Sequence, residues 1–203
     1  DFCLSRGLGD VYKRQLLKYI KEFEKYVEIT GFKNAKIKDV EEFLNTIRKE
    51  KRPNVEIQFF DAEFVATWQH LYFAVLNALT AFKNKKNISK SLAMETLLYA
   101  SAQRQIRKAM ELLGIKPNIQ KIALLIIGEK PEIVKTALST VSTNIDAQNE
   151  EAVLELSEEK KKMIQKTFQI SDLELKTTMK KNDLEKALIN LVIERMALLA
   201  TQC

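Results

Sequence analysis

The chain has 203 residues, of which 46% are hydrophobic and 30% are charged, and this composition predicts a globular protein and excludes a disordered one. The formal net charge of +6 is compatible with a nucleic acid or an acidic partner, although a lysine-rich surface that only faces solvent gives the same value. Cys3 and Cys203 are the only cysteines and stand at the two ends, so neither a disulfide framework nor a cysteine metal site is expected.

The first residues differ in character from the rest of the chain. Residues 5–15 read Ser-Arg-Gly-Leu-Gly-Asp-Val-Tyr-Lys-Arg-Gln and resemble the translation of a transposon adaptor used in sequencing libraries. We therefore expect residues 1–15 not to be native and treat residues 16–203 as one domain. The alternative is a disordered native N-terminus.

The first half of the chain contains two strand patterns and two helical patterns. Residues 26–30 are rich in β-branched and aromatic side chains and predict a strand, and residues 55–60 alternate apolar and polar side chains and predict another. Between them, residues 38–52 have apolar side chains at helical spacing and end before a proline. Residues 63–82 form the most apolar helical pattern, which predicts a helix central to the core.

A basic polar stretch, residues 83–87, separates that helix from the next. Either Ser89 or Ser91 is a suitable N-cap for a second long helix over residues 92–113.

The second half begins with a continuous apolar run at residues 121–127, which predicts a central strand covered on both faces. Helices are predicted over residues 131–142, 157–168 and 183–201. The pattern predicts an α/β (α+β) fold in which helices cover a small mixed sheet of three to four strands within a single helix-rich domain.

No apolar run is long enough to cross a bilayer, and the start lacks the apolar segment of a secretory signal. We therefore expect a cytoplasmic protein without a membrane partner.

The residues that usually carry catalysis are scarce. His70 is the only histidine and lies inside the most apolar predicted helix, where a structural role is favoured over a base or metal ligand. Outside residues 1–15 only Gly31, Gly114 and Gly128 remain, so no glycine-rich phosphate loop is formed. We expect a non-enzymatic protein with no catalytic residue, no metal, no cofactor and no small-molecule substrate of its own.

The last predicted helix has more apolar surface than docking on one side of a sheet requires. The extra apolar residues lie away from its main face: Ile189, Ile193, Met196 and Leu199. The excess indicates either a surface for a partner or a helix buried on several sides within its own domain, and the pattern leaves both open.

A second unusual feature is the interruption of an apolar stripe by small and polar residues at 101–106. Arg104, Arg107 and Lys108 then lie on an outward face. Together with the lysines at 83, 85, 86 and 90 they predict a phosphate-binding surface, and a solvated basic face is the alternative.

Residues 87–106 (Asn-Ile-Ser-Lys-Ser-Leu-Ala-Met-Glu-Thr-Leu-Leu-Tyr-Ala-Ser-Ala-Gln-Arg-Gln-Ile) resemble the signature of the PRPK-binding protein family. Two further segments are similar to that family, residues 193–199 and residues 57–62 leading into 71–82. The likeness runs from about residue 54 to the end, and Ala102 departs from it because members often carry glycine there.

This resemblance implies a compact α/β fold and the role of small regulatory subunit in the KEOPS (EKC) complex, with no enzymatic activity. The implied partners are the small atypical kinase/ATPase of that complex and tRNA, whose 3′ CCA end the archaeal members recognise. The complex makes threonylcarbamoyladenosine at tRNA position 37.

The resemblance also implies a role for each of the two unusual features. The candidate tRNA-binding residues are Lys83, Lys85, Lys86, Asn87, Ile88, Lys90, Ser101, Gln103, Arg104, Gln105 and Arg107. The candidate kinase-binding residues are Ile189, Ile193, Glu194, Arg195, Met196 and Leu199.

Two rival hypotheses remain. A helical enzyme that uses buried carboxylates predicts a polar cleft with Glu95 or Asp61 at its base. A purely protein-binding adaptor predicts no affinity for RNA even at low salt.

Overall fold

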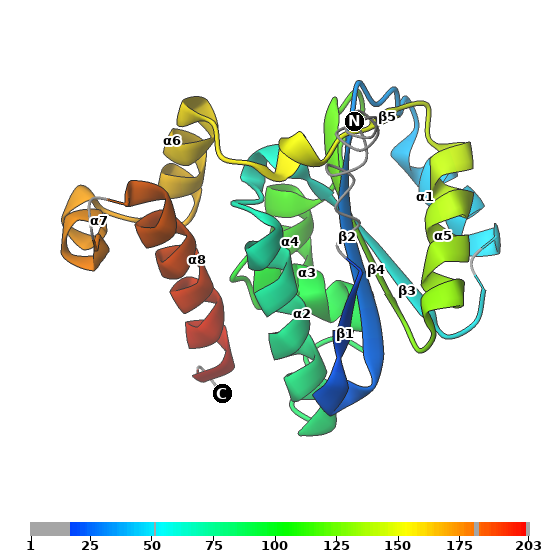
Figure 1. Ribbon diagram of the computed structural model, residues 1–203, viewed down its shortest axis with the longest axis horizontal. Helices are drawn as coiled ribbons and strands as arrows, with labels where there is room; N and C mark the ends of the chain where they lie inside the picture. Colours follow the sequence, from blue (N-terminus) through cyan, green and yellow to red (C-terminus); the bar gives the residue numbers. More distant parts are fainter. Residues whose placement is uncertain (1–16, 51, 181–182, 202–203) are drawn as a thin grey trace, which may run out of the picture.

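The computed structural model describes residues 17–50, 52–180 and 183–201 (Figure 1). The expected non-native segment, residues 1–15, lies outside the described residues. Helices cover both faces of one open sheet, so the predicted α/β class is confirmed. The five strands are β1 (Lys18–Ile20), β2 (Lys25–Lys33), β3 (Val55–Asp61), β4 (Lys121–Gly128) and β5 (Gln148–Asn149).

The sheet differs in detail from the prediction of three to four mixed strands. Its order is β1-β2-β4-β3, with β5 paired to β2, and every pairing is antiparallel. β1 and β5 have only three and two residues, too few to show an alternating pattern in the sequence. The relative direction of strands depends on their connections in space, which apolar periodicity does not report.

The central strand is covered on both faces, as predicted. Residues 122–128 of β4 are all buried, and alternate side chains enter different halves of the core. Leu125 and its same-face neighbours contact the layer of α2 (Trp68–Lys83), α3 (Leu92–Ala100) and α4 (Ile106–Leu113). Leu124 and Ile126 contact the layer of α1 (Val40–Glu50) and α5 (Pro131–Asn144).

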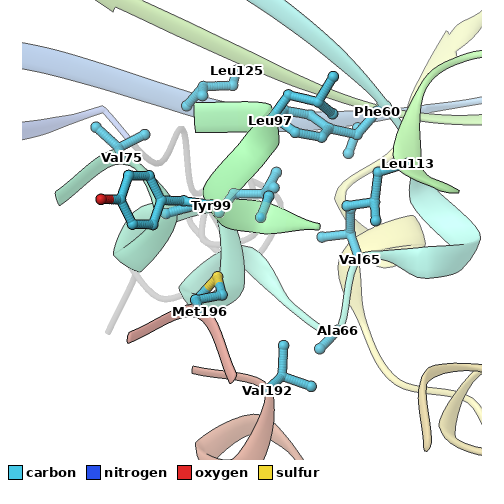
Figure 2. Packing of buried hydrophobic residues seen from close by; sticks show 14 of the residues in the cluster. Phe60, Val65, Ala66, Val75, Leu97, Tyr99, Leu113, Leu125, Val192 and Met196 are labelled. Atoms are coloured by element: carbon cyan, nitrogen blue, oxygen red, sulfur yellow. The ribbon is translucent and has the colours of Figure 1, made fainter. Parts of the chain in front are cut away.

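A third layer packs on the outer side of α2 (Figure 1). It contains α6 (Glu158–Thr167), α7 (Asp172–Thr178) and α8 (Leu184–Thr201). Figure 2 shows Val192 and Met196 of α8 turned toward the cluster that includes Ala66 and Tyr99. No helix in the described part of the chain is long and apolar enough to cross a membrane.

Two predicted helices are divided in the structure. The helix predicted from residue 63 starts at Trp68, after a 3-10 turn at Ala62–Phe64. The helix predicted over residues 92–113 is two helices, because Ala102 takes a left-handed φ of 51° and the N–H of Gln103 donates to the carbonyl of Leu98. The apolar stripe resumes at helical spacing after residues 101–106, so periodicity alone predicted one helix.

Candidate nucleic-acid and protein interfaces

The loop between α2 and α3, residues 83–90 and called the basic loop below, presents four exposed lysines at positions 83, 85, 86 and 90. The end of α2 sets its direction, because the N–H groups of Asn84 and Lys86 donate to the carbonyls of Thr80 and Ala81. Ile88 stands among the lysines with 41% of its surface exposed. The loop therefore combines cationic groups with one apolar contact surface.

A buried carboxylate holds the backbone of this loop through hydrogen bonds. Glu95, in the first turn of α3, is 0% exposed. Its two oxygens accept from the N–H of Ile88 at 3.1 and 3.0 Å, and Oε2 also accepts from the N–H of Ser89 at 2.7 Å. The partial positive charge at the start of α3 further favours the carboxylate there.

Two more hydrogen bonds complete the fixed shape of the loop. Asn87 Nδ2 donates to the carbonyl of Ser89 at 2.9 Å, and the N–H of Ser91 donates to Ser89 Oγ at 3.2 Å. Ser91 is the N-cap of α3, since its hydroxyl accepts from the N–H of Met94. Of the two serines considered as caps, Ser91 therefore caps the helix and Ser89 orders the loop.

The second group of candidate RNA-binding residues forms the turn between α3 and α4. Ser101 is buried and its hydroxyl donates to the carbonyl of Leu98 at 3.1 Å, whereas Gln103 is half-buried. Arg104, Gln105 and Arg107 are exposed, and Arg107 pairs with Glu111 one turn further along α4. Ser101 thus orders the turn and is not available to a ligand.

The structure separates the two groups of candidate RNA-binding residues. They lie at opposite ends of α3, whose nine residues span about 13 Å at 1.5 Å per residue. His70, near the start of α2, is hydrogen-bonded to Ala100 at the far end of α3 from the basic loop. The residues expected in one surface therefore form two patches, because α2 and α3 pack as a hairpin.

The candidate kinase-binding residues on α8 differ in how deeply they are buried. Met196 is 0% exposed and Leu199 is buried with it against the core. Ile189 and Ile193 are half-buried, and Glu194 is exposed. Met196 and Leu199 are thus core residues, and a partner cannot contact them while α8 stays in place.

The remaining candidate, Arg195, pairs with Glu174 of α7. This contact and the hydrogen bonds from Ser171 hold the pKa of Glu174 at about 2. Glu174 also completes the capping box with Ser171 that starts α7. Contacts of α8 with α2, α3 and α7 account for much of its apolar surface, which favours the hypothesis of a helix buried on several sides.

The family model described as kinase binding protein CGI-121 matches residues 32–200. The chain belongs to this family. The regulatory protein Cgi121 of Methanocaldococcus jannaschii is 34% identical over 116 residues, which cover 57% of this chain and 72% of that protein. The family predicted from residues 57–62, 87–106 and 193–199 is confirmed.

In this member of the family, the two carboxylates named by the enzyme hypothesis have structural partners. Glu95 holds the basic loop, and Asp61 accepts from the N–H of Glu63 at 3.1 Å at the start of a 3-10 turn. Burial raises the pKa of Asp61. Among the described residues, no group of three or more His, Cys, Asp and Glu side chains is placed to hold a metal ion.

A buried lysine was not identified from the sequence. Lys160 of α6 is 4% exposed, and its Nζ donates to the carbonyl of Val153 at 2.8 Å. Burial lowers its pKa to about 8. Its neighbours in sequence are charged as well, so only the arrangement of α6 over the 3-10 turn at Ala62–Phe64 places it inside.

Proposed function

We propose that this protein is a non-catalytic regulatory subunit of the KEOPS complex that binds the 3′ CCA end of tRNA and docks on the small atypical kinase/ATPase. In this role it supports threonylcarbamoyladenosine formation at tRNA position 37 without reacting itself. Membership of a kinase-binding family and the regulatory relative support the assignment.

The RNA-binding half of this proposal rests mainly on the side chains and hydrogen bonds of the basic loop. Four exposed lysines lie on either side of Ile88 along the loop, the side chain of Ile88 is itself exposed, and the buried carboxylate of Glu95 holds the loop backbone. Lysines bind phosphates, and an apolar group between them offers a surface to an unstacked base. Arg104, Gln105 and Arg107 form a second patch, which we assign to phosphates further along the same strand.

The kinase-docking part rests on the outward side of α8. Ile189, Ile193 and Glu194 remain accessible there, and Arg195 is half-buried. Partly exposed apolar side chains bordered by charged residues are typical of a protein-binding helix face.

The test is equilibrium binding of the full chain to a tRNA with and without its terminal CCA, at low and physiological salt. We expect tighter binding to the intact tRNA, weakening as salt rises because released counterions drive phosphate contacts. Reversing two loop charges, Lys85→Glu with Lys86→Glu, should weaken binding and reduce the salt slope by roughly 0.7 for each lost contact with a single strand.

The matched control reverses the charge of two exposed lysines on the opposite face of the sheet, Lys38→Glu with Lys49→Glu. This variant has the same net charge as the loop variant. Equal loss in both double variants would contradict a specific site on the basic loop. Absence of any CCA dependence would overturn the RNA-binding part and favour the protein-binding adaptor.

A further inference from the structure

Glu95 is placed unusually for a glutamate in a helix of the core. It is fully buried in α3, which packs against α2, and an apolar side chain at this position would pack without the cost of desolvating a charge. The N-cap of α3 is already supplied by Ser91, so the helix does not need Glu95 to begin. Its carboxylate accepts hydrogen bonds from the backbone N–H groups of Ile88 and Ser89, both in the basic loop.

The position of these two N–H groups decides what Glu95 controls. Ile88 is the apolar group of the loop, and Lys86 and Lys90 lie two residues to either side of it. Fixing the backbone at Ile88 and Ser89 therefore fixes the direction in which the side chain of Ile88 leaves the backbone and limits the positions that the neighbouring lysines can reach. A loop held in its bound shape loses less conformational freedom when a ligand binds, which raises affinity.

We propose that Glu95 is a positioning residue for RNA recognition: its carboxylate holds the basic loop in the shape that receives the RNA strand, without touching the RNA itself. This inference rests on the proposed function of the loop. The sign of its charge makes it testable, because removing a carboxylate makes the protein more positive by one. Electrostatics alone would then strengthen binding to a polyanion.

The experiment compares Glu95→Gln with wild type in two measurements on the full chain. The first is affinity for tRNA with and without CCA, and the second is backbone amide hydrogen exchange at Ile88 and Ser89 by NMR. The amide of glutamine has one acceptor oxygen in place of two. We expect faster exchange at both amides and about ten-fold weaker binding to intact tRNA, despite the added positive charge.

The matched control is Glu132→Gln, an exposed first-turn glutamate of α5 on the opposite face of the sheet. It changes the net charge by the same amount and should leave binding unchanged or slightly tighter. Glu95→Met keeps a similar volume and removes the acceptors altogether, so it should weaken binding at least as much as Glu95→Gln. It also supplies the comparison if the glutamine variant does not fold.

The outcomes separate this inference from the proposed function. Wild type that binds both RNAs equally overturns the proposed function, and with it any role of Glu95 in RNA recognition. Wild type that requires CCA, together with Glu95 variants that bind as tightly as wild type, overturns the inference alone. Faster amide exchange with unchanged affinity also overturns it, because the loop would then bind without its fixed shape.

Discussion

The Nε2 of His70 donates a hydrogen bond to the carbonyl oxygen of Ala100 across 2.8 Å, in the interior of the protein. The other ring nitrogen, Nδ1, accepts from the N–H of Ala66 at 3.1 Å, so the neutral ring carries its proton on Nε2. The histidine thus joins the segment before α2 to the end of α3, where the turn with Arg104 begins. The structural role expected for the only histidine agrees with this geometry.

The first prediction concerns the pH dependence that His70 produces. Burial lowers its pKa from 6.5 to about 4, so the unfolded chain binds a proton more readily than the folded one in this interval. The contribution of His70 to stability is therefore complete above pH 6.5 and is lost as pH falls toward 4, by up to about 3 kcal/mol. His70→Gln should remove this contribution, which is measured as the difference in urea midpoint between wild type and variant from pH 4 to 8.

His70→Phe is the companion variant, because phenylalanine removes both hydrogen bonds as well as the titration. It should destabilise the protein at pH 7 by about 1–3 kcal/mol for each buried backbone group left without a partner. A difference in stability between wild type and both variants that stays constant from pH 7 to pH 4 would show that His70 does not titrate in this way.

The second prediction concerns Glu28 of β2, which is 3% exposed and whose Oε1 has no hydrogen-bond partner among the residues that the structure describes. Burial, assisted by the charge of Glu151, raises its pKa from 4.5 to about 7. The folded state then holds the proton more tightly, so its contribution to stability is present below pH 4.5 and is lost as pH rises through 7.

Glu28→Gln should therefore stabilise the protein at pH 8 by up to about 3 kcal/mol and have little effect at pH 4. Because His70 acts in the opposite direction over much of the same interval, wild type should show a shallow profile that each single variant makes steeper. Thermal unfolding at both pH values is the measurement, and an unchanged melting temperature at pH 8 would contradict it.

The third prediction separates core from surface on α8. Met196→Ala removes fully buried volume and should cost about 2–5 kcal/mol in the free energy of unfolding. Ile193→Glu changes a half-buried side chain at the edge of the core and should weaken binding to the purified kinase subunit at least about ten-fold, with a smaller loss of stability than Met196→Ala.

Ile106→Glu, an exposed isoleucine on α4, is the control for the kinase measurement and should bind normally. Kinase binding that survives Ile193→Glu at wild-type affinity would remove this face of α8 from the proposed interface.

The fourth prediction concerns Ala102, which adopts the left-handed conformation that glycine tolerates best. Ala102→Gly should raise stability by about 0.5–1 kcal/mol, since relief of the backbone strain outweighs the added freedom of the unfolded chain. Ala197→Gly, at an exposed position inside α8, should instead lower stability by about 1 kcal/mol. Chemical denaturation of both variants provides the comparison, and destabilisation by both would refute the explanation of the helix break.

The left-handed Ala102 also illustrates what the sequence could not show. The resemblance to the family indicated glycine at this position, but the apolar pattern before and after residues 101–105 is compatible with an unbroken helix. The break places α4 against the 3-10 turn before α2, a contact between residues far apart in the chain. Local periodicity carries no information about such contacts.

The sequence by itself determined the family, the α/β class, the doubly covered central strand and the place of the basic loop. These features depend on residue types and on spacing over a few turns, which the chain displays directly. Only the tertiary structure decided that Met196 and Leu199 face the core, that the two basic patches lie at opposite ends of α3, and that Glu95 holds the basic loop. An apolar or charged side chain has the same identity whether it meets its own fold, a partner or water, and only the arrangement of helices in space selects among them.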